Sequence, residues 1–269
     1  MTPTLTHTEA ARHFPAASVV VGIGFREAEN AHRLRRNMTK AEQLRQELIE
    51  SIAHDMQTPL AALQGMAQTL ARGEPLPPER QRELHQAMLR QTIRLRHLVA
   101  QFLDYSRIEA GRTLSFNVAP TDVAERVASI ASTFGHANPI EVDVPADLPP
   151  AFVDADRLLQ VLANLISNAV KFSARGSPIL VSARETGDEL ELVVTDHGRG
   201  MSETELSRAF EKFYRGSSAP EATGSGLGLY ITREIVEGQG GKITATSRPG
   251  EGCRVAVRLP KAPEPGGSR

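Results

Sequence analysis

A histidine and an acid stand side by side in Ser51–Leu60, and a threonine follows the histidine by four residues. A carboxylate beside a histidine can hold the proton of one ring nitrogen, which leaves the other nitrogen free as a nucleophile. On a helix, Thr58 lies one turn from His54 on the same face, where its hydroxyl can position water. An isolated histidine is more often a packing or surface residue. His54 and Asp55 therefore indicate phosphate chemistry only if a phosphate donor site occurs elsewhere in the chain.

Three polar residues recur at helical spacing in the otherwise apolar segment 154–172. Asn164, Asn168 and Lys171 are four and three residues apart, which places them on one helix face. An amide oxygen is a suitable ligand for Mg²⁺, and a lysine offers a positive charge to phosphate oxygens. The face can therefore hold a metal-nucleotide complex, but a solvated helix face explains the spacing equally well.

A short turn with two glycines follows an apolar strand further along the chain. Asp196 ends the strand, and Gly198 and Gly200 allow a flat ligand to approach the backbone closely. A carboxylate at this point can accept a hydrogen bond from the amino group of adenine, where guanine presents an oxygen. Asp-Gly turns are common between strands, so this segment alone is weak evidence.

A second glycine-rich segment leads into a helix that is expected to run to about residue 237. Free backbone N–H groups at a helix start favour phosphate. The segment is not a Walker loop, because no Gly-Lys-Ser or Gly-Lys-Thr follows it. Its residues of interest are Gly224, Gly226, Leu227 and Gly228.

The stretch between the two glycine segments combines aromatic residues with cations. Phe210–Arg215 reads Phe-Glu-Lys-Phe-Tyr-Arg, and Arg215 opens a Ser- and Gly-rich stretch that can act as a lid. A plain amphipathic turn with solvated charges is the alternative interpretation.

The bulk composition excludes several classes of protein. The 269 residues suffice for two domains, and 31 Lys and Arg against 32 Asp and Glu give no basic field for nucleic acid. One cysteine, Cys253, cannot form an internal disulfide, which fits a reducing cytoplasm. The apolar run 16–25 is far shorter than the roughly 20 residues of a membrane-spanning helix. We expect a cytoplasmic chain without a membrane segment.

Two long helices are predicted before residue 111. The first covers residues 29–70, the segment 72–78 with its glycine and prolines breaks it, and the second covers residues 79–110 up to Gly111. Each helix carries an apolar stripe at steps of three and four, and two antiparallel helices cannot enclose both stripes. Pairing with a second copy as a four-helix bundle solves this, so a homodimer is expected.

Short strands alternate with helices beyond Gly111, which predicts a second domain of mixed α/β type. A helix capped by Thr121 or Asp122 and a second helix over 154–172 are expected to pack on a sheet. The predicted strands are 114–118, 140–144, 179–184, 190–195, 242–247 and 254–259.

In order and together, these segments resemble the sensor histidine kinases of two-component systems, over roughly residues 40–260. Gln57 departs from the family pattern, in which a basic residue is frequent, and His197 stands where asparagine is frequent. Ser51–Leu60 is similar to the H-box, and the N, G1, F and G2 boxes are similar to Asn164–Phe172, Asp196–Met201, Phe210–Arg215 and Gly224–Leu229.

The resemblance implies an α+β multidomain fold, with a hairpin that forms a dimeric four-helix bundle and then an α/β sandwich that binds ATP. It makes His54 the phosphate acceptor and Asp55 its base, and it makes Asn168 the Mg²⁺ ligand. The remaining implied roles concern ATP: Asn164 and Lys171 support metal and phosphates, Asp196 reads adenine, Gly198, Gly200, Gly224, Gly226, Leu227 and Gly228 shape the site, and Arg215 reaches the γ-phosphate.

The implied partner is the receiver domain of a response regulator, whose aspartate takes the phosphate from His54. Thr58 would serve removal of phosphate from that regulator, which predicts a bifunctional kinase and phosphatase. About 30 N-terminal residues are too few for a typical sensory domain of about 100 residues, so a separate sensory partner or a missing region is expected to supply the signal.

The expected domain borders are a tail over 1–28, a phosphotransfer domain over 29–111, an ATP-binding domain over 112–262 and a disordered tail over 263–269. Two rival functions make different demands on these residues. A scaffold that binds ATP without transferring phosphate has no need of His54, Asn168 and Asp196 together. An ATPase that clamps nucleic acid or a client protein has no use for the H-box hairpin.

Overall fold

The computed structural model describes residues 46, 49–72, 76–134, 138–216 and 225–263. Residues 1–50 and 51–269 form two units, and the second carries the structure discussed below, apart from residues 49 and 50 at the start of the first helix. The predicted tail 1–28, most of the apolar stripe of the first helix, Gly224 and residues 264–269 lie outside the described residues. Within the described residues, no helix combines the length and the apolar character that crossing a membrane requires.

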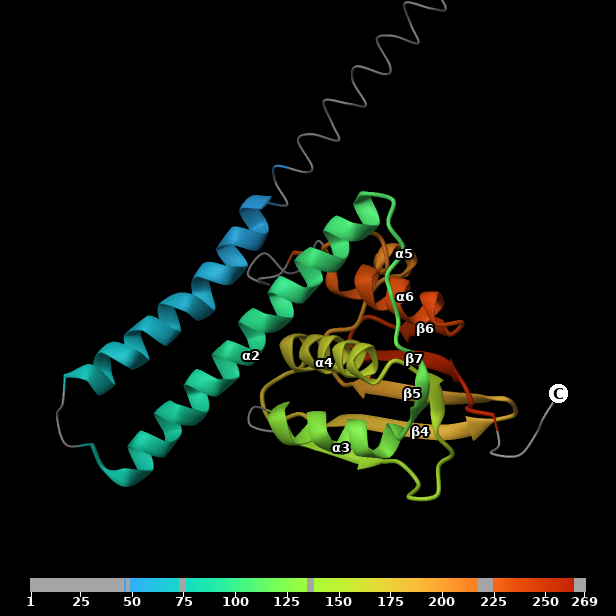
Figure 1. Ribbon diagram of the computed structural model, residues 1–269, viewed down its shortest axis with the longest axis horizontal. Helices are drawn as coiled ribbons and strands as arrows, with labels where there is room; N and C mark the ends of the chain where they lie inside the picture. Colours follow the sequence, from blue (N-terminus) through green and yellow to red (C-terminus); the bar gives the residue numbers. More distant parts are fainter. Residues whose placement is uncertain (1–45, 47–48, 73–75, 135–137, 217–224, 264–269) are drawn as a thin grey trace, which may run out of the picture. The chain divides into compact units, whose positions relative to one another are not determined.

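The part of the chain before Gly111 forms a pair of helices (Figure 1). The first covers residues 49–71, and α2 runs over Pro78–Glu109. Pro78 occupies the first turn of α2, where the missing N–H costs nothing. Gly111, at φ 68°, ends the helix, and the N–H of the next residue, Arg112, donates to the carbonyl of Arg107 at 2.9 Å. Both ends of α2 agree with the prediction to within one residue.

The apolar stripe that was predicted for α2 is covered, with Leu84 and Tyr105 buried and the other members half-buried. A second set of large apolar side chains on the same helix stays exposed: Leu89 at 62%, Val99 at 40% and Leu103 at 50%. A helix that is apolar on two sides needs a second surface to cover it.

A five-stranded mixed sheet forms the second domain, in the order β2-β4-β5-β7-β6. Only the β2–β4 pair is parallel, and the other neighbours are antiparallel. Two further strands, β1 and β3, pair with each other outside this sheet. The strand bounds are β1 Ala119–Thr121, β2 Ile140–Asp143, β3 Ala151–Val153, β4 Ile179–Thr186, β5 Glu189–Asp196, β6 Lys242–Ser247 and β7 Cys253–Pro260.

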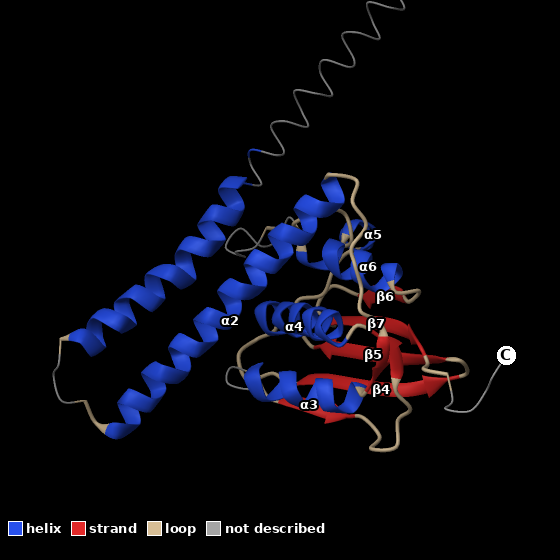
Figure 2. Cartoon of the chain, viewed as in Figure 1, coloured by secondary structure: helices blue, strands red, loops and turns tan. Residues whose placement is uncertain are grey.

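Three helices, α3 (Val123–Phe134), α4 (Ala155–Phe172) and α6 (Gly228–Gly238), pack on the sheet with α4 in the middle (Figure 2). A shorter helix, α5 (Glu203–Arg208), lies near β6. The apolar side chains of α4 are removed from water against this layer, and each large one contributes about 1.5–3 kcal/mol. The buried apolar residues of α4 are Leu158, Val161, Leu162, Leu165, Ile166 and Ala169.

Asp154 fixes the start of α4. Its Oδ1 accepts hydrogen bonds from the backbone N–H groups of Asp156 and Arg157 at 3.0 and 3.1 Å, as an N-cap does. Its Oδ2 accepts from the N–H of Asn117 at 2.7 Å, and its own N–H donates to Gln239 Oε1 at 2.6 Å. One carboxylate thus joins the segment after α2 to the helix that carries the predicted Mg²⁺ ligand.

The structure corrects the prediction of a strand over 114–118. Burial alternates there, with Phe116 half-buried, but the segment has no ladder and β1 begins only at Ala119. A Cβ on Gly238 would lie 2.7 Å from two ring atoms of Phe116, so the Phe116 side chain packs against the end of α6 instead. Three elements were not predicted: β1, β3, and α5, which begins with a capping box between Ser202 and Glu205.

Candidate functional site

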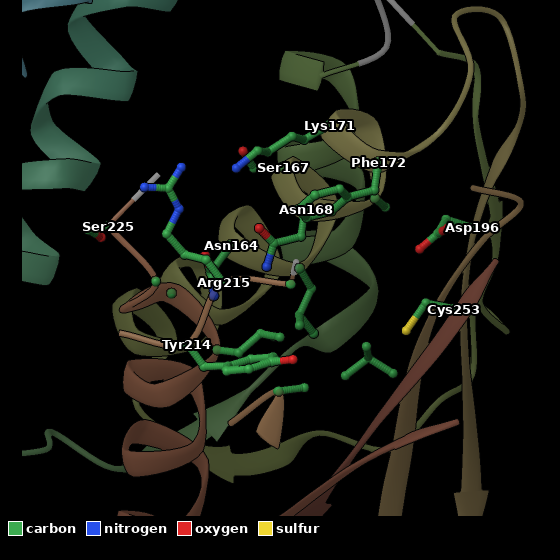
Figure 3. A pocket seen from close by; sticks show the side chains of 18 of the residues that line it. Asn164, Ser167, Asn168, Lys171, Phe172, Asp196, Tyr214, Arg215, Ser225 and Cys253 are labelled. Atoms are coloured by element: carbon green, nitrogen blue, oxygen red, sulfur yellow. The ribbon is translucent and has the colours of Figure 1, made fainter. Parts of the chain in front are cut away.

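A pocket of about 250 Å³ is lined by residues from the H-box helix, α2, α4, the region from β5 to α5, the F-box and second glycine segments, and β7 (Figure 3). Nine of the predicted site residues line it: Asp55, Asn164, Asn168, Lys171, Asp196, Gly200, Arg215, Gly226 and Gly228. Four others, His54, Thr58, Gly198 and Leu227, are described but do not line it, and Gly224 lies outside the described residues.

The N-box face of α4 forms one wall, with Asn164, Asn168 and Lys171 following one another along the helix in Figure 3. Asn168 is half-buried, so its amide is accessible from the pocket. Partial burial lowers the pKa of Lys171, an effect that the nearby Asp55 charge opposes. A lysine that is partly removed from water among other cations favours an anionic ligand.

Asp196 also lines the pocket, at the end of β5. Its Oδ1 accepts a hydrogen bond from the N–H of Gly198 at 2.8 Å, and the residue is 8% exposed. Burial raises the pKa of Asp196, and the backbone N–H groups of Gly198 and Cys253 oppose this shift. A buried carboxylate with an accessible oxygen suits a neutral hydrogen-bond donor such as an amino group.

Gly198 and Gly200 of this turn must be glycines, because other backbone segments lie where a Cβ would stand. At Gly200, with φ 66°, a Cβ would lie 1.8 Å from the carbonyl oxygen of Arg248 in the β6–β7 turn. At Gly198, a Cβ would lie 2.4 Å from the carbonyl oxygen of Phe172 at the end of α4. The turn is therefore held between α4 and the β6–β7 hairpin, which fixes where Asp196 points.

Cys253 faces Asp196 across the β5–β7 pair and lines the same end of the pocket (Figure 3). Burial, followed by the Asp196 charge, raises the pKa of the Cys253 thiol to about 12, so it stays protonated. This residue was missed as a site residue, because strand register decides which β7 side chain meets Asp196.

The F-box residues connect the pocket to the hairpin. The N–H of Phe213 donates to the carbonyl of Gly226 at 3.1 Å, which ties this segment to the second glycine segment. Phe213 has φ 66°, and its ring meets Tyr105 of α2 edge-on at 5.4 Å between centroids. Lys212 Nζ donates to Glu109 Oε1 at 2.6 Å, although both side chains are exposed and the pair contributes little stability.

The H-box residues divide between solvent and pocket. His54 is exposed, whereas Asp55 is 5% exposed and lines the pocket, with an Oδ2 that has no hydrogen-bond partner among the described residues. Burial raises the pKa of Asp55, and the charges of Lys171, His54, Arg94 and Arg215 oppose this, in that order. The carboxylate therefore sits among cations from other segments and beside the exposed imidazole.

Thr58 is exposed, and its Oγ1 donates to the carbonyl of His54 at 3.4 Å. The hydroxyl is thus held one turn along the helix from the histidine.

Helix α2 adds pocket residues that the sequence did not reveal. Arg94, His97, Leu98 and Gln101 line the pocket at steps of three, one and three. Leu98 belongs to the apolar stripe of α2. The other three residues are polar, and they become pocket residues only because α2 and α4 come together in the folded chain.

Two family models match the chain. Residues 44–111 match the His Kinase A (phospho-acceptor) domain, and residues 153–263 match the histidine kinase-, DNA gyrase B-, and HSP90-like ATPase. Together they account for both the hairpin and most of the domain that carries the pocket.

Curated relatives and a solved structure agree with these models. Sensor protein KdpD of Escherichia coli (strain K12) is 35% identical over 238 residues, which are 86% of this chain and 26% of KdpD. Sensor-like histidine kinase SenX3 of Mycobacterium tuberculosis (strain ATCC 25618 / H37Rv) is 32% identical over 82% of this chain and 55% of SenX3. This chain therefore spans between a quarter and about half of such relatives.

The crystal structure of full-length ShkA in complex with AMPPNP superposes with a TM-score of 0.56 at 25% identity. The match covers 83% of this chain and 47% of ShkA.

Proposed function

This chain belongs to the sensor histidine kinases of two-component systems, and on that premise we propose that it transfers the γ-phosphate of ATP to its own His54. The observation that carries the proposal is the H-box helix, on which an exposed His54 adjoins an Asp55 buried in the same pocket as Asn168, Lys171 and Asp196. Acceptor and donor residues thus come together within one chain.

The pocket carries groups that suit both the base and the phosphates of ATP. Asp196 offers a buried carboxylate for the amino group of adenine, and Lys171 and Arg215, which line the same pocket, offer positive charge for phosphates. Gly226 and Gly228 precede or begin α6, so backbone N–H groups can approach the phosphates. The AMPPNP bound by the structural relative ShkA supports a nucleotide in this fold.

The Asn168 amide fits Mg²⁺, because it is a neutral oxygen donor in the wall that also carries Lys171. Bound there, Mg²⁺ would neutralise charge on the phosphates. Asn168 would hold the ion by its amide oxygen, and Lys171 would hold phosphate oxygens by charge.

In the transfer, a neutral nitrogen of His54 attacks the γ-phosphorus, a nitrogen–phosphorus bond forms, and the bond to the bridging oxygen breaks to release ADP. Asp55 accepts the proton of the other ring nitrogen, which keeps the attacking lone pair available. Arg215, beside Lys171 in the pocket, stabilises charge on the transferred group.

We further propose that the phosphate passes from His54 to an aspartate on the receiver domain of a response regulator, and that Thr58 positions water to remove it again. The exposed position of His54 supports access by another protein. We also infer a homodimer, because Leu89, Val99 and Leu103 form an uncovered apolar side of α2. A separate sensory partner would provide the signal.

Incubation of the purified protein with magnesium and γ-labelled ATP tests the kinase. The label should be acid-labile and base-stable, as phosphohistidine is, and should vanish in His54→Gln. His85→Gln is the matched control, because His85 is an exposed histidine on α2 without an acid neighbour. ADP formation without any protein label would instead favour a simple ATPase, and binding without either product would favour a scaffold.

A further inference from the structure

Helices α2, α4 and α6 meet at the side chain of Asn164. Gln101 Nε2 of α2 donates to Asn164 Oδ1 at 3.3 Å, and Asn164 Nδ2 donates to Thr232 Oγ1 of α6 at 2.6 Å. The Thr232 hydroxyl in turn donates to the carbonyl of Gly228 at 2.9 Å. Gly228 is the first residue of α6, at the phosphate end of the pocket.

The chain of donors has a fixed direction. A hydroxyl has one hydrogen, and Thr232 uses it toward Gly228, so the oxygen of Thr232 must accept from Asn164. This leaves the Asn164 oxygen as the acceptor for Gln101. The other hydrogen of the Gln101 amide can bond His97 Nε2 at 2.8 Å, provided that this nitrogen carries no proton.

These hydrogen-bonded side chains are buried, so losing one of the hydrogen bonds would leave a polar group without a partner. Gln101 and Asn164 are each 6% exposed, and Thr232 is 2% exposed, so water cannot easily replace a lost partner. Asn164 Oδ1 also lies only 2.4 Å from the place where a Cβ on Gly228 would stand. A rotation of the Asn164 amide would therefore press on the first turn of α6.

We propose that Gln101 is a positioning residue of the hairpin that sets the phosphate-binding start of α6 through Asn164 and Thr232. The inference rests on the proposed function, in which Gly228 approaches the phosphates of ATP. It gives Asn164 a narrower role than support of the metal, because both ends of its amide are bonded within the protein. Movement of α2 would change the donor at Asn164 and, through it, nucleotide affinity.

A purely structural role for Gln101 makes a different prediction. Gln101 would then only fill the gap between α2 and α4, next to the Asp104–Arg157 ion pair that already joins these helices. Its loss would lower the melting temperature without a specific effect on nucleotide binding. The relay instead predicts weaker binding at temperatures where the protein is fully folded.

The test measures the Kd of AMPPNP with magnesium, and the melting temperature, for Gln101→Met and Thr232→Val. Both changes keep the side-chain volume and remove a link. Each should raise the Kd by roughly threefold to tenfold, the range expected for one buried hydrogen bond. Gln86→Met, an exposed glutamine on the same helix, is the matched control and should bind like the wild type.

The double variant distinguishes a relay from two separate effects. If Gln101 acts through Thr232, the Kd of Gln101→Met with Thr232→Val should be no higher than that of the weaker-binding single variant. Multiplied effects, an unchanged Kd in Gln101→Met, or tighter binding would each overturn the inference. Failure of the wild type to bind AMPPNP would count against the proposed function, whereas normal wild-type binding with no Gln101 effect would count only against the relay.

Discussion

Asp104 of α2 and Arg157 of α4 form a buried ion pair, with Arg157 Nη1 2.6 Å from Asp104 Oδ2. Gln160 Nε2 donates to the same oxygen at 2.8 Å, and Arg157 Nη1 also reaches Gln160 Oε1 at 2.8 Å. The carboxylate is the deeper partner, because the Asp104 side chain is 3% exposed and that of Arg157 is 16% exposed. The contact joins the hairpin to the helix of the N-box.

Removing the two partners of this pair should have unequal effects. Arg157→Met leaves a buried carboxylate with only Gln160 to compensate it, and we expect a loss of about 3 kcal/mol in the free energy of unfolding. Asp104→Asn leaves an arginine that can reach water, and about 1 kcal/mol is expected. Urea unfolding of both variants measures this. A larger loss in Asp104→Asn would contradict the burial argument.

His97 should make the folded protein less stable in acid. Burial lowers the pKa of His97 from its ordinary value of 6.5, and the Arg96 charge adds to the effect. The unfolded chain then takes up the proton first, so stability is complete above about pH 6.5 and falls as the pH drops through the folded pKa. Urea midpoints between about pH 5 and about pH 7.5 should show a shallower slope in His97→Asn. Parallel slopes would show that His97 does not contribute.

Two glycines with the same backbone angle provide a test of the G1 turn. Gly187, at φ 65°, has open space around its Cα, whereas a Cβ on Gly200, at φ 66°, meets the carbonyl of Arg248. Alanine at Gly187 should lower the free energy of unfolding by only about 1–2 kcal/mol, the cost of a left-handed backbone conformation for a residue with a Cβ. Alanine at Gly200 should cost at least about 2 kcal/mol more and weaken nucleotide binding. Similar melting temperatures for the two variants would contradict the packing.

Replacing Asp196 by asparagine should impair recognition of adenine. Oδ1 of Asp196 accepts from the Gly198 N–H, and a carboxylate has a second acceptor oxygen to offer the adenine amino group, whereas an asparagine has only one acceptor oxygen. We expect ATP affinity to fall by roughly tenfold or more and the preference over GTP to shrink. Competition binding with both nucleotides measures this. An unchanged preference would remove Asp196 from the proposed specificity.

Thr58→Ala should slow the loss of phosphate from the response regulator by roughly a hundredfold, because a positioned water is lost. Thr69→Ala is a close control, since the Thr69 hydroxyl also bonds the carbonyl four residues back on the same helix, at 2.9 Å. The decay of a phosphorylated receiver domain in the presence of each variant measures the effect. Equal decay with the two variants would refute the phosphatase role.

Local signals predicted the elements that carry the nucleotide site. The apolar residues of α4 predicted the N-box helix, and Gly111 marked the end of α2. The glycine segments were placed correctly after β5 and before α6. Such features depend on residues that are close together in the sequence, so they can be predicted from the sequence alone.

Features that depend on distant partners were not predictable. Cys253 meets Asp196 only through strand register, and Gln101 meets Asn164 only because α2 packs against α4. The segment 114–118 has the alternation of a strand, but Phe116 packs on α6 and the segment joins no sheet. Helix α5 is different, because its Ser202–Glu205 capping box was legible and was overlooked.

The packing of Phe116 on Gly238 decides how the catalytic half should be excised for study on its own. The ATPase family match begins at residue 153, yet Phe116 covers the end of α6 and Asn117 bonds the cap of α4. A fragment that starts at the first strand, at residue 119, would uncover the α6 terminus and remove one donor from Asp154. A fragment that starts near residue 112 keeps both contacts. We expect this fragment to be more stable and more soluble than the one that starts at residue 119.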